Sequence, residues 1–257
     1  RHITPLEKER ISDPEAALDG RPLRLSSVRV CSPIPHPEQD IICLGVNYAA
    51  HADESAQFDR KAFLLDRKKA TYFSKRAYQT SGPDDLIPSY PELVTSLDYE
   101  AELAVIIGRD CKNVCERDAA ACIFGYTVLN DVSARNLQTE HNQWYFGKSL
   151  DGFTPMGPCI VTEDEIPYPP ALSISSTVNG ELRQNSNTKY LLHSISEIIA
   201  ELSQGMTLLA GTIIATGTPA GVGMGFDPPK FLKSGDVVTC EIEKIGNTSR
   251  TMKFEAR

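Results

Sequence analysis

The strongest constraint on the fold is the order in which strand-like and helical segments follow one another. Apolar residues alternate or run together, as they do in half-buried or buried strands, in residues 40–45, 97–107, 125–131, 212–216 and 237–245. Clear helical spacing is found in residues 191–202, before Gly205, and a shorter helix is expected over 118–124. Because strands outnumber helices and do not alternate regularly with them, we predict an α+β fold with a mixed sheet or roll.

The length of the chain is that of one main domain with a small addition. Its 257 residues, 41% hydrophobic and 23% charged, are enough to bury a sizeable core. Residues 1–35 are polar with one strand-like run, 23–30, so we expect a small N-terminal β element there, followed by the main domain at 36–257. Residues 55–90 are charged and show little periodicity, which is typical of a functional lid.

Charge and cysteine content argue against several classes of protein. A net charge of −8 argues against a nucleic-acid-binding protein, which needs clustered Lys and Arg. No apolar run approaches the roughly 20 residues that span a bilayer, and no signal-peptide pattern is present, so we expect no membrane association and a cytoplasmic or organelle-matrix location. The seven cysteines form no repeating framework and predict reduced thiols. Cys111 and Cys115 lack the second pair of ligands that a structural zinc site needs.

Two glutamates stand inside the strand-like segment 97–107. Successive side chains of a strand point to opposite faces, so Glu100 and Glu102 are expected on one face. A solvated face with two acids is one interpretation, but Ala104 and Ile106 share that face and favour burial. Two buried carboxylates a few ångströms apart are costly unless one is protonated or a cation lies between them.

A third acid, Asp131, ends the next strand-like segment. Asp is a preferred helix N-cap residue, and capping is the simpler interpretation of Asp131 by itself. Together with Glu100 and Glu102, it would complete a set of oxygen ligands without Cys or His. Such a set suits Mg²⁺, Mn²⁺ or Ca²⁺ rather than zinc, and it leaves coordination positions open for water and substrate.

Four motifs, in this order and spacing, resemble the fumarylacetoacetate hydrolase family. They are DYEAELAVIIG at residues 98–108, GYTVLNDVSAR at 125–135, GKSLD at 147–151 and ATGTPAG at 215–221. The resemblance extends over about residues 40–250 and implies a catalytic domain with a mixed β-roll, usually a homodimer. It also implies one Mg²⁺, Mn²⁺ or Ca²⁺ ion held by Glu100, Glu102 and Asp131.

The same resemblance assigns roles to further polar residues. It places Lys148 in substrate or oxyanion binding, with Arg135, Gln138 and Thr218 lining the pocket. Without the resemblance, Lys148 and Arg135 would be interpreted as surface charges, Gln138 as a helix-surface residue and Thr218 as a turn hydroxyl. The glycine-rich segment that begins at Gly217 offers backbone N–H groups that suit a substrate carboxylate, although a plain turn is the simpler interpretation.

His51 and Glu54 match a His-x-x-Glu pair that is found in hydrolytic members of the family. A spacing of three puts both side chains on one face if the segment is helical, and the carboxylate would then orient the imidazole for proton transfer. Considered alone, His51 is better explained as an exposed residue of a mobile loop. The family context favours the catalytic pair.

The resemblance implies a metal-dependent hydrolase that cleaves a carbon–carbon bond in a small β-diketo or 2-oxo acid, such as an acylpyruvate. His51 and Glu54 would activate water, while Lys148 holds the developing negative charge. Decarboxylation of oxaloacetate, hydrolysis or dehydration of 2-oxo-3-deoxy sugar acids and isomerisation of 2-hydroxymuconate-type acids are alternatives within the family. The presence of both His51 and Glu54 favours hydrolysis over isomerisation. A non-catalytic metal-binding relative is least favoured, because the acidic set is complete.

Overall fold

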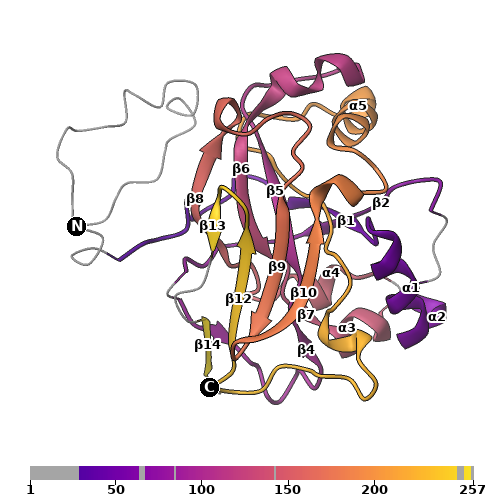
Figure 1. The fold of residues 1–257 in the computed structure, drawn as a ribbon, viewed down its shortest axis with the longest axis vertical. Coiled ribbons are helices and arrows are strands. Elements are labelled where there is room, and N and C mark those ends of the chain that lie inside the picture. Colours follow the sequence, from indigo (N-terminus) through magenta and orange to yellow (C-terminus); the bar gives the residue numbers. More distant parts are fainter. Residues whose placement is uncertain (1–28, 64–66, 84, 142, 248–251, 256–257) are drawn as a thin grey trace.

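Two sheets pack against each other in the computed structural model, which describes residues 29–63, 67–83, 85–141, 143–247 and 252–255 (Figure 1). The first sheet is mixed, because β1 and β11 are parallel while its other neighbouring strands are antiparallel. In spatial order its six strands are β2 (Thr71–Lys75), β1 (Ile41–Gly45), β11 (Ile213–Ala215), β5 (Ala101–Ile107), β6 (Ile123–Asn130) and β8 (Met156–Thr162).

The second sheet covers one face of the first. Its main path, in spatial order, is β10 (Glu181–Asn187), β9 (Ser173–Val178), β12 (Val237–Ile242), β14 (Met252–Glu255) and β3 (Ile87–Pro88), and β13 (Gly246–Asn247) pairs with β12. A separate two-stranded sheet joins β4 (Leu97–Asp98) to β7 (Ser133–Ala134). The predicted α+β fold with a mixed sheet is therefore confirmed.

The α-helices of the described residues are short. They are α1 (Ala49–Phe58), α2 (Arg60–Phe63), α3 (Arg135–Glu140), α4 (Tyr145–Lys148) and α5 (Ile195–Gly205). In Figure 1, α5 lies at the opposite end of the molecule from α3 and α4. None of the helices in the described ranges is both long and apolar enough to cross a membrane.

The central strand β5 is buried on both faces. Leu103 and Val105 belong to the same hydrophobic cluster as Val238 of the second sheet, while Ala104 and Ile106 belong to a second cluster on the opposite face. All seven residues of β5 are buried. A polar side chain on this strand must therefore find its partners inside the protein.

Several predicted boundaries are corrected by hydrogen bonding. The segment 97–107 is not one strand, since β4 ends at Asp98 and β5 begins at Ala101. At the break, the carboxylate of Asp98 accepts hydrogen bonds from the backbone N–H groups of Tyr99 and Gly223. The short helix predicted over residues 118–124 is a 3₁₀ helix at Glu116–Cys122, and β6 begins at Ile123. The predicted helix at 191–202 begins only after Ser194, which caps α5 through a capping box with Glu197.

Some other segments contain more helices and strands than predicted, and one predicted element lies mostly outside the described residues. Residues 55–90 contain the end of α1 together with α2, β2 and β3. The hairpin of β9 and β10 was not predicted, because its strands are rich in Ser, Thr and Asn. The proposed N-terminal β element lies outside the described residues except for 29–35, which form no strand, so the division at residue 35 stays a prediction.

The loop after β1 is tied to β11 by one buried amide. Asn47 is 1% exposed, and its Nδ2 donates to the carbonyl of Thr216 at 2.9 Å and to that of His193 at 3.1 Å. Its Oδ1 accepts from the backbone N–H of His193 at 2.8 Å. This side chain therefore holds the start of α1 beside the glycine-rich segment that follows β11.

We expect Asn47→Ala to lower the free energy of unfolding by about 3 kcal/mol, because it leaves buried backbone groups without partners. Urea denaturation measures the change. Asn185→Ala, at an exposed position of β10, is the control and should stay within about 0.5 kcal/mol of the parent protein. Equal losses in the two variants would contradict the role assigned to Asn47.

Candidate functional site

Three acidic side chains meet at the ends of β5 and β6. Glu102 lies on β5, Glu100 immediately precedes that strand, and Asp131 immediately follows β6, whose Asn130 pairs with Ala101. The backbone N–H of Asp131 donates to the carbonyl of Glu100 at 2.9 Å. All three acids are buried, and one oxygen from each lies within 4.8 Å of the others. The alternative of a solvated acidic strand face is therefore wrong.

Asp131 does not cap a helix. The next helix, α3, begins at Arg135, and its N-cap residue is Ala134. Asp131 is fully buried and points its carboxylate at two lysines: Lys75 Nζ lies 2.8 Å from Oδ1, and Lys148 Nζ lies 2.8 Å from Oδ2. The N-cap interpretation is thus replaced by a role in a buried charge cluster.

Glu100 is enclosed by two cations from α3 and α4. Arg135 Nη1 lies 2.7 Å from Oε1, and Lys148 Nζ lies 2.9 Å from Oε2. Arg135 also donates from Nε to Asp98 at 2.9 Å and from Nη1 to Gln138 at 3.0 Å. Neither Arg135 nor Lys148 is a surface charge, since both are at most 2% exposed.

The cluster has one positive charge fewer than it has carboxylates, and Glu102 is the carboxylate for which the described part of the chain gives no ion pair. Among the described residues, four buried carboxylates (Asp98, Glu100, Glu102 and Asp131) face three buried cations (Lys75, Arg135 and Lys148). Burial and the nearby Asp131 and Glu100 raise the pKa of Glu102 well above its ordinary value. Burial also acts to raise the pKa of Glu100, but Lys148 and Arg135 outweigh it and hold that pKa below its ordinary range. A divalent cation between these oxygens would balance the charge, so the donor set fits Mg²⁺ or Mn²⁺.

The glycine-rich segment 217–225 supplies hydrogen bonds to the protein's own carboxylates. Gly217 N–H donates to Glu102 Oε2 at 2.8 Å, Gly221 N–H to Glu54 Oε1 at 2.9 Å, and Gly223 N–H to Asp98 Oδ1 at 2.6 Å. Gly217 has φ +94°, and a Cβ there would lie 2.8 Å from the Cβ of Asn47. These three amides are therefore already used and do not face a substrate carboxylate, contrary to our interpretation of the sequence.

His51 and Glu54 lie together on α1. His51 Nδ1 is 3.1 Å from Glu54 Oε2, and His51 is only 5% exposed, which rules out the exposed-loop interpretation. Glu54 packs directly on Gly225, where a Cβ would lie 1.8 Å from Oε1. Because an ionised carboxylate only accepts hydrogen bonds, the contact with Glu54 favours the tautomer with a proton on Nδ1; Nε2, 3.4 Å from the Ser55 hydroxyl, is then the basic nitrogen.

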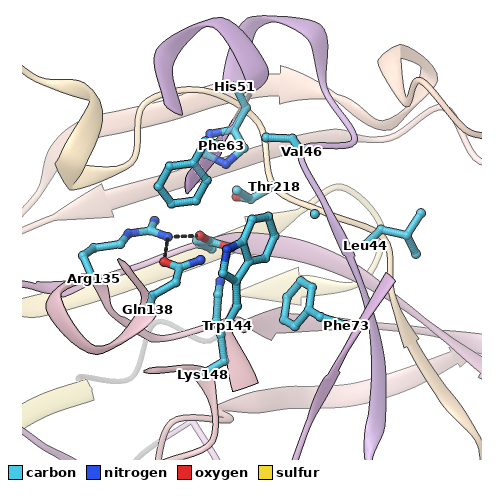
Figure 2. Close-up of a pocket in the computed structure, with 12 residues that line it drawn as sticks. Leu44, Val46, His51, Phe63, Phe73, Arg135, Gln138, Trp144, Lys148 and Thr218 are labelled. Carbon is cyan, nitrogen blue, oxygen red and sulfur yellow. Dashed lines mark hydrogen bonds and ion pairs between the residues drawn. The ribbon is translucent and has the colours of Figure 1, made fainter. Parts of the chain in front are cut away.

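One narrow pocket joins the histidine to the acidic cluster. Its polar wall comes from His51, Glu100, Arg135, Gln138, Lys148 and Thr218, and its apolar wall from Leu44, Gly45, Val46, Phe63, Phe73 and Trp144 (Figure 2). Gly217 is not in contact with it. Thr218 donates its hydroxyl proton to the carbonyl of Ala101 at 2.8 Å, which fixes the side chain at the pocket wall.

Sequence reasoning missed Lys75, Asp98 and Trp144. Lys75 is buried, but nothing in the segment TYFSK indicates that its lysine is buried. Its partners, Val132, Lys148 and Asp131, lie far away in the sequence. Asp98 stands in one of the recognised motifs, but only the folded chain shows that its carboxylate joins Arg135 to Gly223 and Met224.

Opposite effects on stability are expected for neutralising the two glutamates in metal-free protein. Glu102→Gln should raise the melting temperature, because the pKa of Glu102 is raised and its charge is unfavourable, whereas Glu100→Gln should cost about 3–5 kcal/mol by leaving Arg135 and Lys148 short of a partner. Thermal unfolding in EDTA measures both. Changes of the same sign would contradict the charge balance described above.

Comparison with known proteins places this geometry in a family. The family model for the C-terminal domain of fumarylacetoacetate hydrolase matches residues 40–253. Oxaloacetate tautomerase YisK of Bacillus subtilis is 46% identical over 225 residues, 88% of this chain and 73% of the relative. The mitochondrial oxaloacetate tautomerase fahd2 of Xenopus laevis is 41% identical over 253 residues, 97% of this chain and 76% of the relative.

Solved structures give the same assignment. A fumarylacetoacetate hydrolase from Exiguobacterium antarcticum is 43% identical with a TM-score of 0.79, covering 92% of this chain and 81% of the other. A 2-hydroxyhepta-2,4-diene-1,7-dioate isomerase from Mycobacterium marinum is 34% identical with a TM-score of 0.72, covering 90% and 79%. The chain therefore belongs to the fumarylacetoacetate hydrolase family, whose members are enzymes that generally bind divalent metal ions.

Proposed function

We propose that this chain catalyses the keto–enol tautomerisation of a small 2-oxo dicarboxylate of the oxaloacetate type, with Glu100, Glu102 and Asp131 holding Mg²⁺ or Mn²⁺. The observation that carries the proposal is the unbalanced buried acidic cluster, one member of which, Glu100, lines the same pocket as His51. Two relatives named oxaloacetate tautomerases, at 46% and 41% identity, support this reaction over the hydrolysis that we ranked first from the sequence.

The proposed metal ligands fit a hard cation. Carboxylate oxygens without Cys or His favour Mg²⁺, Mn²⁺ or Ca²⁺, and three protein ligands leave positions for a chelating substrate. A bound ion would polarise the 2-oxo group and stabilise negative charge on its oxygen. Lys75 holds the other oxygen of Asp131, Oδ1, through a 2.8 Å ion pair.

His51 is the proposed base. Glu54 fixes the imidazole through Nδ1, so Nε2, which lies 3.4 Å from the Ser55 hydroxyl, is the nitrogen that would accept the proton from the carbon next to the carbonyl group. The same imidazolium then returns a proton to the enolate oxygen, so that the reaction consumes no water. Lys148, with three N–H donors beside the acidic cluster, would stabilise the oxygen while it carries charge.

Arg135 is the proposed carboxylate anchor. Its Nη2 is buried and has no hydrogen-bond partner among the described residues, while Nε and Nη1 are held by Asp98, Glu100 and Gln138. A guanidinium fixed in this way keeps one donor for an incoming carboxylate. Gln138, on the same helix, lines the pocket beside it and would contact the same end of the substrate.

Hydrolysis of an acylpyruvate is the second candidate. It uses the same groups, except that His51 Nε2 would take a proton from water instead of from carbon. The related structure named fumarylacetoacetate hydrolase, at 43% identity, supports this alternative.

The homodimer implied by the resemblance also stays a proposal, and light scattering tests it.

We expect the purified protein with Mg²⁺ or Mn²⁺ to accelerate the enol-to-keto conversion of freshly dissolved oxaloacetate, measured by the loss of enol absorbance in the ultraviolet. Pyruvate assayed in parallel separates this reaction from decarboxylation, and acylpyruvates with the same assay test hydrolysis. EDTA should abolish the activity. Release of pyruvate from acylpyruvates without tautomerisation of oxaloacetate would favour the hydrolase, and no turnover of either substrate would refute both.

Replacing the proposed base should impair turnover without loss of metal binding. His51→Ala is expected to lower kcat by about 10²–10⁴-fold, the usual contribution of general acid–base catalysis. His141→Ala, at an exposed position outside the pocket, is the matched control. Calorimetric titration with Mn²⁺ should give the same affinity in both variants. Unchanged kcat in His51→Ala would remove His51 from the mechanism.

A further inference from the structure

Three aromatic rings belong to the apolar wall of the pocket, opposite the charged residues. Trp144 precedes α4, and its ring centroid is 5.4 Å from that of Phe63 and 5.3 Å from that of Phe73. In Figure 2 the indole stands between the polar side chains of Arg135 and Gln138 and the ring of Phe73. The indole thus forms the boundary between the polar and apolar parts of the pocket.

The indole also packs against bare backbone. A Cβ built on Gly45 would lie 2.3 Å from Trp144 Cζ3 and 2.8 Å from Cη2, so a side chain at position 45 could not coexist with the ring where it is. Gly45 ends β1 and lines the pocket. The indole is therefore closely packed between Gly45 and the rings of Phe63 and Phe73.

Little space is left beside this ring. The cavity has a volume of about 10 Å³, which is close to the room that one water molecule needs. The charged wall cannot yield much, because Glu100, Arg135 and Lys148 are buried and joined by ion pairs. Trp144 and Phe73 are both only partly buried, but the indole lies between Phe73 and the polar wall, so it is the ring that a longer carbon chain of a ligand would have to displace.

We propose that Trp144 is the specificity-determining residue of this site and limits it to 2-oxo acids with a short carbon chain. Because the cavity has room for little more than one water molecule, a bound 2-oxo acid must displace part of its wall, and a longer carbon chain must displace the indole further. This inference rests on the proposed function for the class of ligand, a 2-oxo acid, but not on which reaction follows binding.

The magnitude of the expected discrimination follows from steric fit. One methylene group too many or too few in an apolar pocket changes selectivity by about 10–200-fold. Trp144→Ala removes the whole indole and opens room for several methylenes beside Phe63 and Phe73. Trp144→Phe keeps an aromatic ring in the cluster and should have a smaller effect in the same direction.

The test compares the affinity for a short and a long ligand. Calorimetric titrations with oxalate and with 2-oxohexanoate, in Mg²⁺ and separately in EDTA, give the ratio of the two dissociation constants. We expect Trp144→Ala to shift this ratio towards 2-oxohexanoate by about tenfold or more, with affinity for oxalate little changed. Tyr145→Ala, a neighbouring exposed aromatic residue outside the pocket, should leave the ratio unchanged.

The outcomes separate this inference from the proposed function. A ratio unchanged in Trp144→Ala and Trp144→Phe, or changed equally in Tyr145→Ala, would overturn the role of Trp144 even if oxaloacetate is turned over. A shifted ratio without turnover by the parent protein would support Trp144 and refute the tautomerase. If Trp144→Ala does not fold, Trp144→Phe alone decides, since its ratio must still move towards the longer ligand.

Discussion

The interaction on which the site depends is the shared contact of Lys148 with Glu100 and Asp131. One ammonium group lies 2.9 Å from the first carboxylate and 2.8 Å from the second, inside the protein. Burying four acids is tolerable only because three cations from different parts of the chain surround them, and each cation is held by backbone or side-chain acceptors. The remaining negative charge, at Glu102, is the part of this arrangement that folding alone does not satisfy. The buried Glu102 therefore lowers the stability of the folded protein at the site where we propose that catalysis occurs.

The glycine-rich segment 217–225 sets the relative position of acid and base. Its amides hold Glu102 on β5, Glu54 on α1 and Asp98 before β5, so one segment is bonded to all three. Asn47 joins the beginning of that segment to the loop before α1. The proposed base and the proposed metal ligands therefore belong to different elements but share one backbone support.

Local patterns in the sequence predicted the elements that are apolar and regular. Strands β1, β5, β6 and β11 and helix α5 follow from alternation or helical spacing, and the closeness of Glu102 and Asp131 follows once β5 and β6 pair. The hairpin of β9 and β10 was missed because its polar side chains are satisfied by partners distant in sequence, as Gln184 is by Thr218 and Ala101. Lys75 was missed for the same reason: its burial depends on carbonyl and carboxylate groups supplied after residue 130.

A single turn of helix, α4, separates Trp144 from Lys148. The backbone N–H of Lys148 donates to the carbonyl of Trp144 at 3.2 Å, so the indole and the ammonium are attached to one short rigid unit. A displacement of that turn that carries the indole away from Gly45 also moves the backbone of Lys148, whose ammonium then keeps its contacts with Glu100 and Asp131 only by extending its side chain. Opening the pocket to an organic ligand would therefore weaken the ion pairs that offset the charges of Glu100 and Asp131. A bound cation would then stabilise these carboxylates more than it does when the pocket is closed.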